Sequence, residues 1–161
     1  MRLHDVVIHE ADAARIDGVL RRFLADSSSA AALLIDRSGQ PLAETRTART
    51  LDVGSIGALA AGAFASTAAL ARLLGESEFS VLFHEGVRES MHVCAVGEQT
   101  ILLVIFDERT TIGMVRLFAR EAAASIGTIL EETRRRPKRV GALAAPLTVE
   151  ETRRASDHRP A

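Results

Sequence analysis

Three side chains in the middle of the chain carry groups that hydrolases use for nucleophilic catalysis: His84, Glu85 and Cys94. A cysteine nucleophile needs a histidine as its base, and a carboxylate can orient that base. Cys94, however, lies within a predicted strand, where cysteine usually acts as a small buried side chain. His84 and Glu85 stand at a strand end and turn, where polar residues are ordinary. We therefore expect no catalytic residue.

Metal and nucleotide chemistry find no better support in the sequence. His92 and Cys94 would share one face of a strand, but two further ligands at a recognisable spacing are missing. The phosphate-binding loop GxxxxGK[ST] does not occur either. We expect no metal and no cofactor.

The densest charge cluster is the basic run at residues 134–139. Two interpretations stay open. Cations are favoured at the C-terminus of a helix, and the same cluster could meet an acidic surface of a partner. Nucleic-acid binding is a weaker third interpretation, because no aromatic side chain that could stack on bases accompanies the charges.

The composition describes one globular domain of ordinary size. The chain has 161 residues, 47% of them hydrophobic, with a net charge of −1 and one cysteine. A net charge this close to zero does not favour binding to nucleic acid or to an anionic membrane surface. No apolar run reaches the roughly 20 residues that span a bilayer, and the first residues lack the apolar region of a secretory signal. We expect a cytoplasmic protein that does not bind membranes.

The apolar periodicity predicts three helices and five strands. The N-terminal and middle helices are predicted over residues 11–25 and 52–75, and the last runs from 110 or 111 to about 134. The strands are predicted at 30–36, 40–45, 78–84, 90–96 and 100–106. The last of these, ILLVIF at 101–106, is apolar throughout, as in a central strand covered on both faces. Beyond Pro137 the composition changes, so we expect a domain over 1–136 and a flexible tail over 137–161.

The middle helix is apolar on two sides. We expect the larger side chains to face the sheet: Ile56, Leu59, Ala60, Ala63, Thr67, Leu70 and Leu74. The opposite side carries small residues where a solvated helix would show charges: Gly54, Ala58, Ala61, Gly62, Ala65, Ala68 and Ala69. The glycines of this helix each cost roughly 1 kcal/mol against alanine, which favours the close approach of another backbone. We infer that a second surface covers this side.

The phrases GESEFSVLFHEG and VGEQTILLVIFDERTTIGMVRL, together with the order α-β-β-α-β-β-β-α, resemble the Roadblock domain family. Within it the chain is similar to the bacterial MglB branch, over roughly residues 11–132. The resemblance implies an α/β fold of the α+β type, with a five-stranded antiparallel sheet. The middle helix would cover one face of this sheet and the terminal helices the other.

The resemblance also implies a homodimer that binds an MglA-like, Ras-family GTPase in its GTP-bound state. Such a protein stimulates GTP hydrolysis without an arginine finger and is not itself an enzyme, and the branch acts in bacterial cell polarity and gliding motility. The partner-binding residues that we expect are Ala58, Ala61, Gly62, Ala65, Ala68, Ala69 and Arg72, with Arg15 and Arg120 as further basic contributors. The dimer interface that we expect is formed by Ile56, Phe79, Val81, Leu82 and Phe83.

Two alternatives to activation remain at this point. A Roadblock dimer could tether a GTPase or another partner without changing hydrolysis. A small-ligand sensor is a third class, because mixed folds of this kind often hold ligands. A sizeable pocket between the sheet and a helix would favour the sensor.

Overall fold

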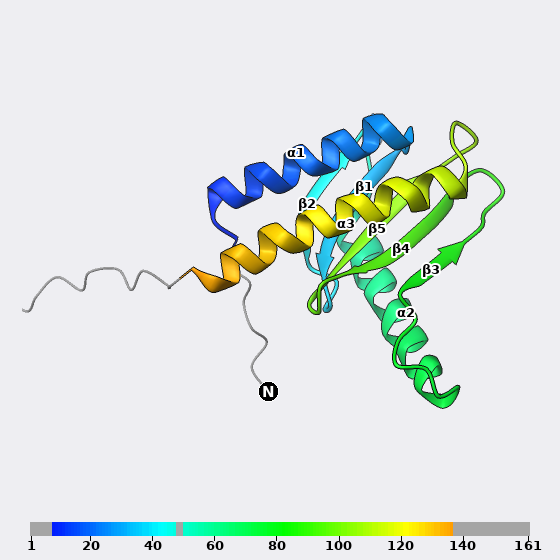
Figure 1. Cartoon of the computed structure of the whole chain (residues 1–161). Coiled ribbons are helices and arrows are strands. Elements are labelled where there is room, and N and C mark those ends of the chain that lie inside the picture. The colour runs from blue at the N-terminus through cyan, green and yellow to red at the C-terminus, as the bar shows by residue number, and fades with distance from the viewer. Residues whose placement is uncertain (1–7, 48–49, 137–161) are drawn as a thin grey trace, which may run out of the picture.

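The computed structural model of the protein describes residues 8–47 and 50–136 (Figure 1). The elements are α1 (Glu10–Ser27), β1 (Ala31–Asp36), β2 (Pro41–Arg46), α2 (Val53–Leu73), β3 (Val81–His84), β4 (Ser90–Val96), β5 (Thr100–Phe106) and α3 (Ile112–Arg135). The predicted order of helices and strands is confirmed. The boundary expected at residue 137, and the tail beyond it, lie outside the described residues.

The strands form one five-stranded sheet in the order β2-β1-β5-β4-β3, and every neighbouring pair is antiparallel. β5 lies in the centre, between β1 and β4, and nearly all of its side chains are buried. This confirms the prediction from its uninterrupted apolar sequence. Because both faces of β5 are apolar, the sheet needs a helical layer on each side.

The two faces of the sheet belong to different cores. Ala32, Leu34, Leu102 and Val104 face α1 and α3, where they pack in a cluster around Ile16, Leu20, Val115 and Ile126. The alternate residues Leu33, Ile35, Ile101 and Leu103 face the other way, toward Phe64 of α2. Two helices thus cover one face, and α2 alone packs on the other (Figure 1).

β3 is shorter than the sequence predicts. The expected strand began at residue 78, but pairing with β4 starts at Val81, which lies opposite Cys94. The chain leaves α2 through Gly75 in a left-handed conformation, with φ at 79°. It must then return to the sheet, so Phe79 lies in the connection, outside β3, and is half-buried.

Among the described residues, one buried side-chain nitrogen has no hydrogen-bond partner. His92 of β4 is 2% exposed, and its Nδ1 makes no hydrogen bond among the described residues. Burial, assisted by the nearby positive charge of Arg116, lowers the pKa of His92 from 6.5 to about 4. The folded protein therefore keeps this imidazole neutral at a pH where the unfolded chain would protonate it.

This difference predicts a pH dependence of the folding free energy. Above pH 6.5 the neutral form prevails in both states and the contribution of His92 is constant; between 6.5 and about 4 the unfolded state gains the proton first. Stability should fall across this window by about 3 kcal/mol, because one pKa unit corresponds to about 1.4 kcal/mol. Urea unfolding at several pH values measures the fall, and His92→Leu should flatten it. An unchanged slope in that variant would contradict the assignment.

Candidate functional site

The middle helix, predicted over residues 52–75, is observed as α2 over Val53–Leu73, with Asp52 as its N-cap. The carboxylate of Asp52 accepts a hydrogen bond from the backbone N–H of Ser55 at 3.1 Å, which caps the first turn. Along the helix, the hydroxyls of Ser66 and Thr67 donate to the carbonyls one turn earlier. Both hydroxyls therefore have hydrogen-bond partners within the helix, and neither needs a polar partner on another surface that packs against α2.

The side of α2 that meets the sheet is set by a close contact of two glycines. A Cβ atom at Gly57 would overlap the carbonyl oxygen of Gly39, in the turn between β1 and β2. Gly39 has φ at 91°, a conformation that glycine adopts without strain. The contact lets Phe64 enter the core, and the Arg37 guanidinium lies 5.2 Å from the centre of its ring. Arg37 also donates to Glu98 O at 3.0 Å, so the turns at this end hold α2 in place.

This packing corrects the predicted orientation of α2. Leu59 and Leu70, expected to face the sheet, are 76% and 51% exposed, and Leu74 is exposed as well. Ala61, expected among the partner-binding residues, is only 4% exposed and packs in the core. The reason is the Gly39–Gly57 contact, which rotates the helix so that Phe64 points inward. Ala61 is therefore not available to a partner.

The opposite side of α2 is an uncovered apolar surface, which we call the α2 face. It consists of the exposed residues Ala58, Leu59, Gly62, Ala65, Ser66, Ala69, Leu70 and Leu73. Gly62 has no atom within 4 Å of the position of a Cβ, so nothing described in this chain requires a glycine there. Arg72 borders the face, exposed and without an ion pair among the described residues, and Ala68 is half-buried beside it. Figure 1 shows α2 extending past the margin of the sheet, so its last turns project from the body.

β3 adds an open strand edge next to α2. It pairs with β4 alone, so its outer edge presents unpaired backbone groups. Leu82 lies on the α2 side of the sheet, where Ile56 is also half-buried. Val81 and Phe83 point to the other side and are 37% and 40% exposed. The Phe83 ring stacks on Phe106 with their centroids 6.2 Å apart.

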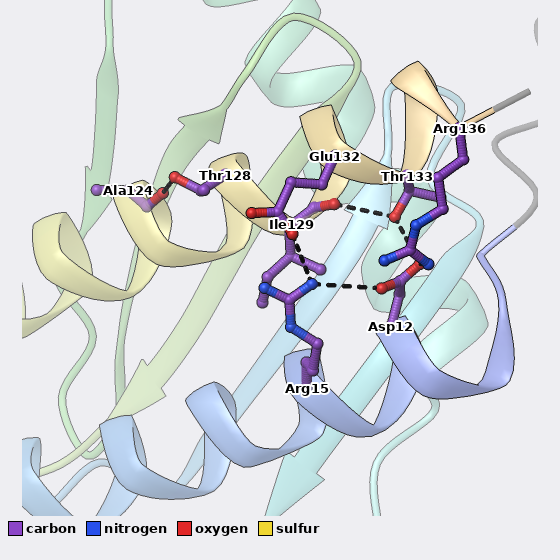
Figure 2. Close-up of polar contacts among 8 residues, drawn as sticks. All are labelled: Asp12, Arg15, Ala124, Thr128, Ile129, Glu132, Thr133 and Arg136. Atoms are coloured by element: carbon purple, nitrogen blue, oxygen red, sulfur yellow. Dashed lines mark hydrogen bonds and ion pairs between the residues drawn. The ribbon is translucent and has the colours of Figure 1, made fainter.

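The structure does not bring Arg15 and Arg120 to the α2 face. Arg15 lies on α1 and Arg120 on α3, and these helices cover the opposite face of the sheet. Arg15 donates to Glu132 at 2.7 Å and to Asp12 at 3.4 Å (Figure 2). Its charge is thus engaged between α1 and α3, so it is not a free contact for a partner on α2.

Asp12 is the centre of this network, and the sequence analysis missed it. Its fully buried carboxylate accepts from Thr133 Oγ1 at 2.9 Å and from Arg136 Nη1 at 2.8 Å (Figure 2). The hydrogen bond from Thr133 and the positive charge of Arg136 hold the pKa of Asp12 below its ordinary value. The network ties the start of α1 to the end of α3.

The groups considered for catalysis remain apart. Cys94 is buried toward α1 and α3, and burial raises the pKa of its thiol to about 11, so it is no nucleophile at neutral pH. His84 stands exposed at the end of β3, in a position that faces the α2 side. Within residues 8–47 and 50–136, no group of three His, Cys, Asp or Glu side chains could hold a metal.

Two hollows on the surface of the described residues lie away from the contact between α2 and the sheet. One, of about 600 Å³, lies between α1 and α3 beside Gly18 and Ser125. The other, of about 540 Å³, is lined by Arg88, Glu89, Asp107 and Glu108 at the ends of β4 and β5. Asp107 accepts from the side chain of Arg109 at 2.8 Å, which supports a local role of this connection.

Comparison with known proteins finds a match to the Roadblock/LC7 domain over residues 16–106. The chain is 34% identical to the gliding protein MglB of Thermus thermophilus, with a TM-score of 0.77, covering 81% of this chain and 99% of that one. For Myxococcus xanthus MglB the identity is 35% and the TM-score 0.73, over 79% of this chain and 96% of that one. A structure of MglB with a tetrameric arrangement is 33% identical, with a TM-score of 0.78, over 82% and 99% of the two chains. No curated protein sequence matches the chain.

The two helix glycines allow a matched test of the site. Gly57→Ala should lower the free energy of unfolding by about 1–3 kcal/mol, because its methyl group meets the backbone of Gly39. Gly62→Ala meets open space and should leave stability unchanged or raise it by up to about 1 kcal/mol. Chemical denaturation of both variants measures the difference. Equal destabilisation would show that the rotation of α2 described above is wrong.

Proposed function

Because the chain belongs to the Roadblock/LC7 domain family, and within it to the MglB branch, we propose that it is a homodimeric activator of an MglA-like, Ras-family GTPase. The protein binds the GTPase in its GTP-bound state and accelerates hydrolysis. It is not itself an enzyme and needs no cofactor. Its process is bacterial cell polarity or gliding motility, as the branch implies.

The dimer is supported by the open edge of β3 and the uncovered α2 face. Two copies of β3 that pair at this edge would join two five-stranded sheets and satisfy the unpaired backbone groups. The same pairing would bring two α2 helices side by side. Ile56, Val81, Leu82 and Phe83 are the interface residues of this proposal, with Phe79 in the connection that precedes β3.

The observation that carries the docking proposal is the α2 face itself. An exposed row of small residues, flanked by leucines and bordered by Arg72, would cost solubility if water alone covered it. Gly62 leaves room for a foreign backbone to approach the helix. We assign the GTPase to Ala58, Gly62, Ala65, Ala68, Ala69 and Arg72. Arg15 and Arg120, on the opposite face of the sheet, are left out of this surface.

Activation by this protein proceeds through the conformation of the GTPase. An arginine finger supplied in trans must reach the γ-phosphate, usually from an exposed loop. Arg72, the one arginine of α2, stands near the end of a regular helix, which does not extend that far. The activator instead binds more tightly to the state in which the arginine and the water-positioning residue of the GTPase are in place. Differential binding of this kind shifts the population toward the active state.

A scaffold that tethers the GTPase is the second candidate, since the same α2 face would serve it. Phosphate release separates the two functions. The purified protein, added in substoichiometric amounts to the MglA-like GTPase loaded with GTP, should accelerate release. A scaffold would bind the GTPase in pull-down and leave the rate at its intrinsic value. The two hollows described above lie away from the contact between α2 and the sheet, so neither of them supports a sensor.

We place the protein in the cytoplasm, away from membranes. α2 is long and apolar enough to cross a bilayer by length and composition. Its first half, however, packs through Phe64 into the same core as β1 and β5. An interface with protein explains the remaining apolar side without a bilayer.

Substituting arginine at both Ala65 and Ala69 should weaken binding of the GTP-bound GTPase at least a hundredfold. The two exposed positions lie one turn apart, and long charged side chains there prevent close approach. Pull-down and titration measure the loss, and light scattering on the same samples reports the dimer. The matched control is Ala14→Arg with Ala124→Arg, two exposed positions on α1 and α3. If the α2 variant still binds the GTPase, the GTPase does not dock on the α2 face.

The proposed mechanism also predicts the result of an arginine scan. Arg72→Ala should weaken affinity, whereas the rate at saturation should stay within about tenfold, a change of about 1.4 kcal/mol in the barrier. Arg109→Ala, in a loop at the other end of the sheet, is the control for a finger from an exposed position. Single-turnover phosphate release at saturating activator gives the rate. A thousandfold loss in either variant with binding intact would mean that an arginine of this chain enters the GTPase site.

A further inference from the structure

Two arginines of α3 are exposed without a partner. Arg116 and Arg120 form no ion pair among the described residues, whereas Arg134 and Arg135 on the same helix both pair with Glu131. An exposed arginine of a structural helix commonly finds a carboxylate one turn away. Two successive turns of α3 thus carry positive charge that no described residue neutralises.

Both arginines lie on the side of α3 that faces away from α1. The α1 side of α3 is marked by Ser125, Thr128 and Ile129, which line the hollow between the two helices. Arg116 lies close enough to His92 of β4 to disfavour protonation of its imidazole. His92 is the register partner of Phe83 in β3. Arg116 therefore points toward the β3 margin of the sheet, and Arg120 follows one turn later on the same side.

The margin of the sheet on this side carries apolar side chains that are partly exposed. Val81 and Phe83 lie on the same side of the sheet as α3 and are 37% and 40% exposed. Figure 1 shows β3 at the margin of the sheet, next to β4, on which α3 packs. Gly127, about two turns after Arg120 on the same side of α3, has no atom within 4 Å of a Cβ position. We call Val81, Phe83, Arg116 and Arg120 the basic strip.

We propose that the basic strip docks an acidic amphipathic helix of a partner protein other than the GTPase. The two arginines would pair with carboxylates along the flank of that helix, and its apolar row would cover Val81 and Phe83. Charge complementarity of this kind sets the orientation and the specificity of docking. From Arg116 to Gly127 the same side of α3 extends for about 16 Å, the length of three helical turns, which gives a docked helix room beyond the strip.

The charge of the strip also excludes the nearest alternative occupants. Residues 137–161 of this chain carry five Lys or Arg against three Asp or Glu, so their net charge does not complement that of the strip. The GTPase is assigned to the α2 face, on the other side of the sheet. In the proposed dimer, β3 pairs with its copy through its backbone edge, and the side chains of Val81 and Phe83 stay on the α3 side of the sheet. Two strips would then lie together there, which would double the positive charge at one surface.

Two designed 18-residue helical peptides test the proposal on the full chain. They share one row of leucines, and glutamates flank the row in one peptide and lysines in the other. Fluorescence anisotropy should show saturable binding of the acidic peptide and at least tenfold weaker binding of the basic one. Arg116→Glu with Arg120→Glu should invert this preference. Arg21→Glu with Arg22→Glu, exposed on α1, makes the same change in net charge and should leave the preference intact.

The other outcomes overturn the proposal. They are no saturable binding below about 1 mM, equal binding of both peptides, or an acidic peptide that the strip variant still binds. Strip-dependent binding of phosphatidylglycerol vesicles or single-stranded DNA that exceeds peptide binding would assign the strip to another class of ligand. Arg116→Gln with Arg120→Gln repeats the test without charge reversal, and the melting temperature confirms folding. GTPase stimulation should be unchanged in these variants, so a failure here is distinguishable from a failure of the proposed function.

Discussion

The apolar sheet must be covered on both faces. Two helices cover one face and a single helix covers the other, and the rest of the structure depends on this difference. α1 and α3 together cover one face and are joined at their far ends by the buried carboxylate of Asp12. On the other face α2 packs alone, through Phe64 and the small residues around it. One helix cannot bury both of its own sides against one sheet. The α2 face and the edge of β3 therefore remain open in a single chain, and both point to partners.

Local patterns were sufficient to predict the elements and their order. Alternating or continuous apolar runs identified the five strands, and apolar side chains at helical spacing located the three helices. The apolar pattern could not predict which side of α2 faces the sheet, because apolar residues occur on both sides of this helix. The outcome was decided by the contact of Gly57 with Gly39, which joins two elements distant in the sequence. Leu59 and Leu70 consequently turned outward, against the expectation from their size.

The candidate site was predicted in part for the same reason. The small residues Ala58, Gly62, Ala65 and Ala69 are exposed as expected, because they lie opposite Phe64 on the helix. Ala61 is buried, and Arg15 belongs to a network between α1 and α3. Asp12 and Thr133 are 121 residues apart, and the sequence around either residue does not predict their hydrogen bond. The small residues of the middle helix indicated a second surface, and the family resemblance added the identity of the expected partner and the placement of the helices on the two faces of the sheet.

The hydropathy of α2 has a consequence for the protein before it meets any partner. A 21-residue helix apolar enough to cross a bilayer is here kept in water with only 22% of its most apolar stretch buried. In a single chain this apolar surface meets only water, so association that covers it becomes more favourable as the concentration of the protein rises.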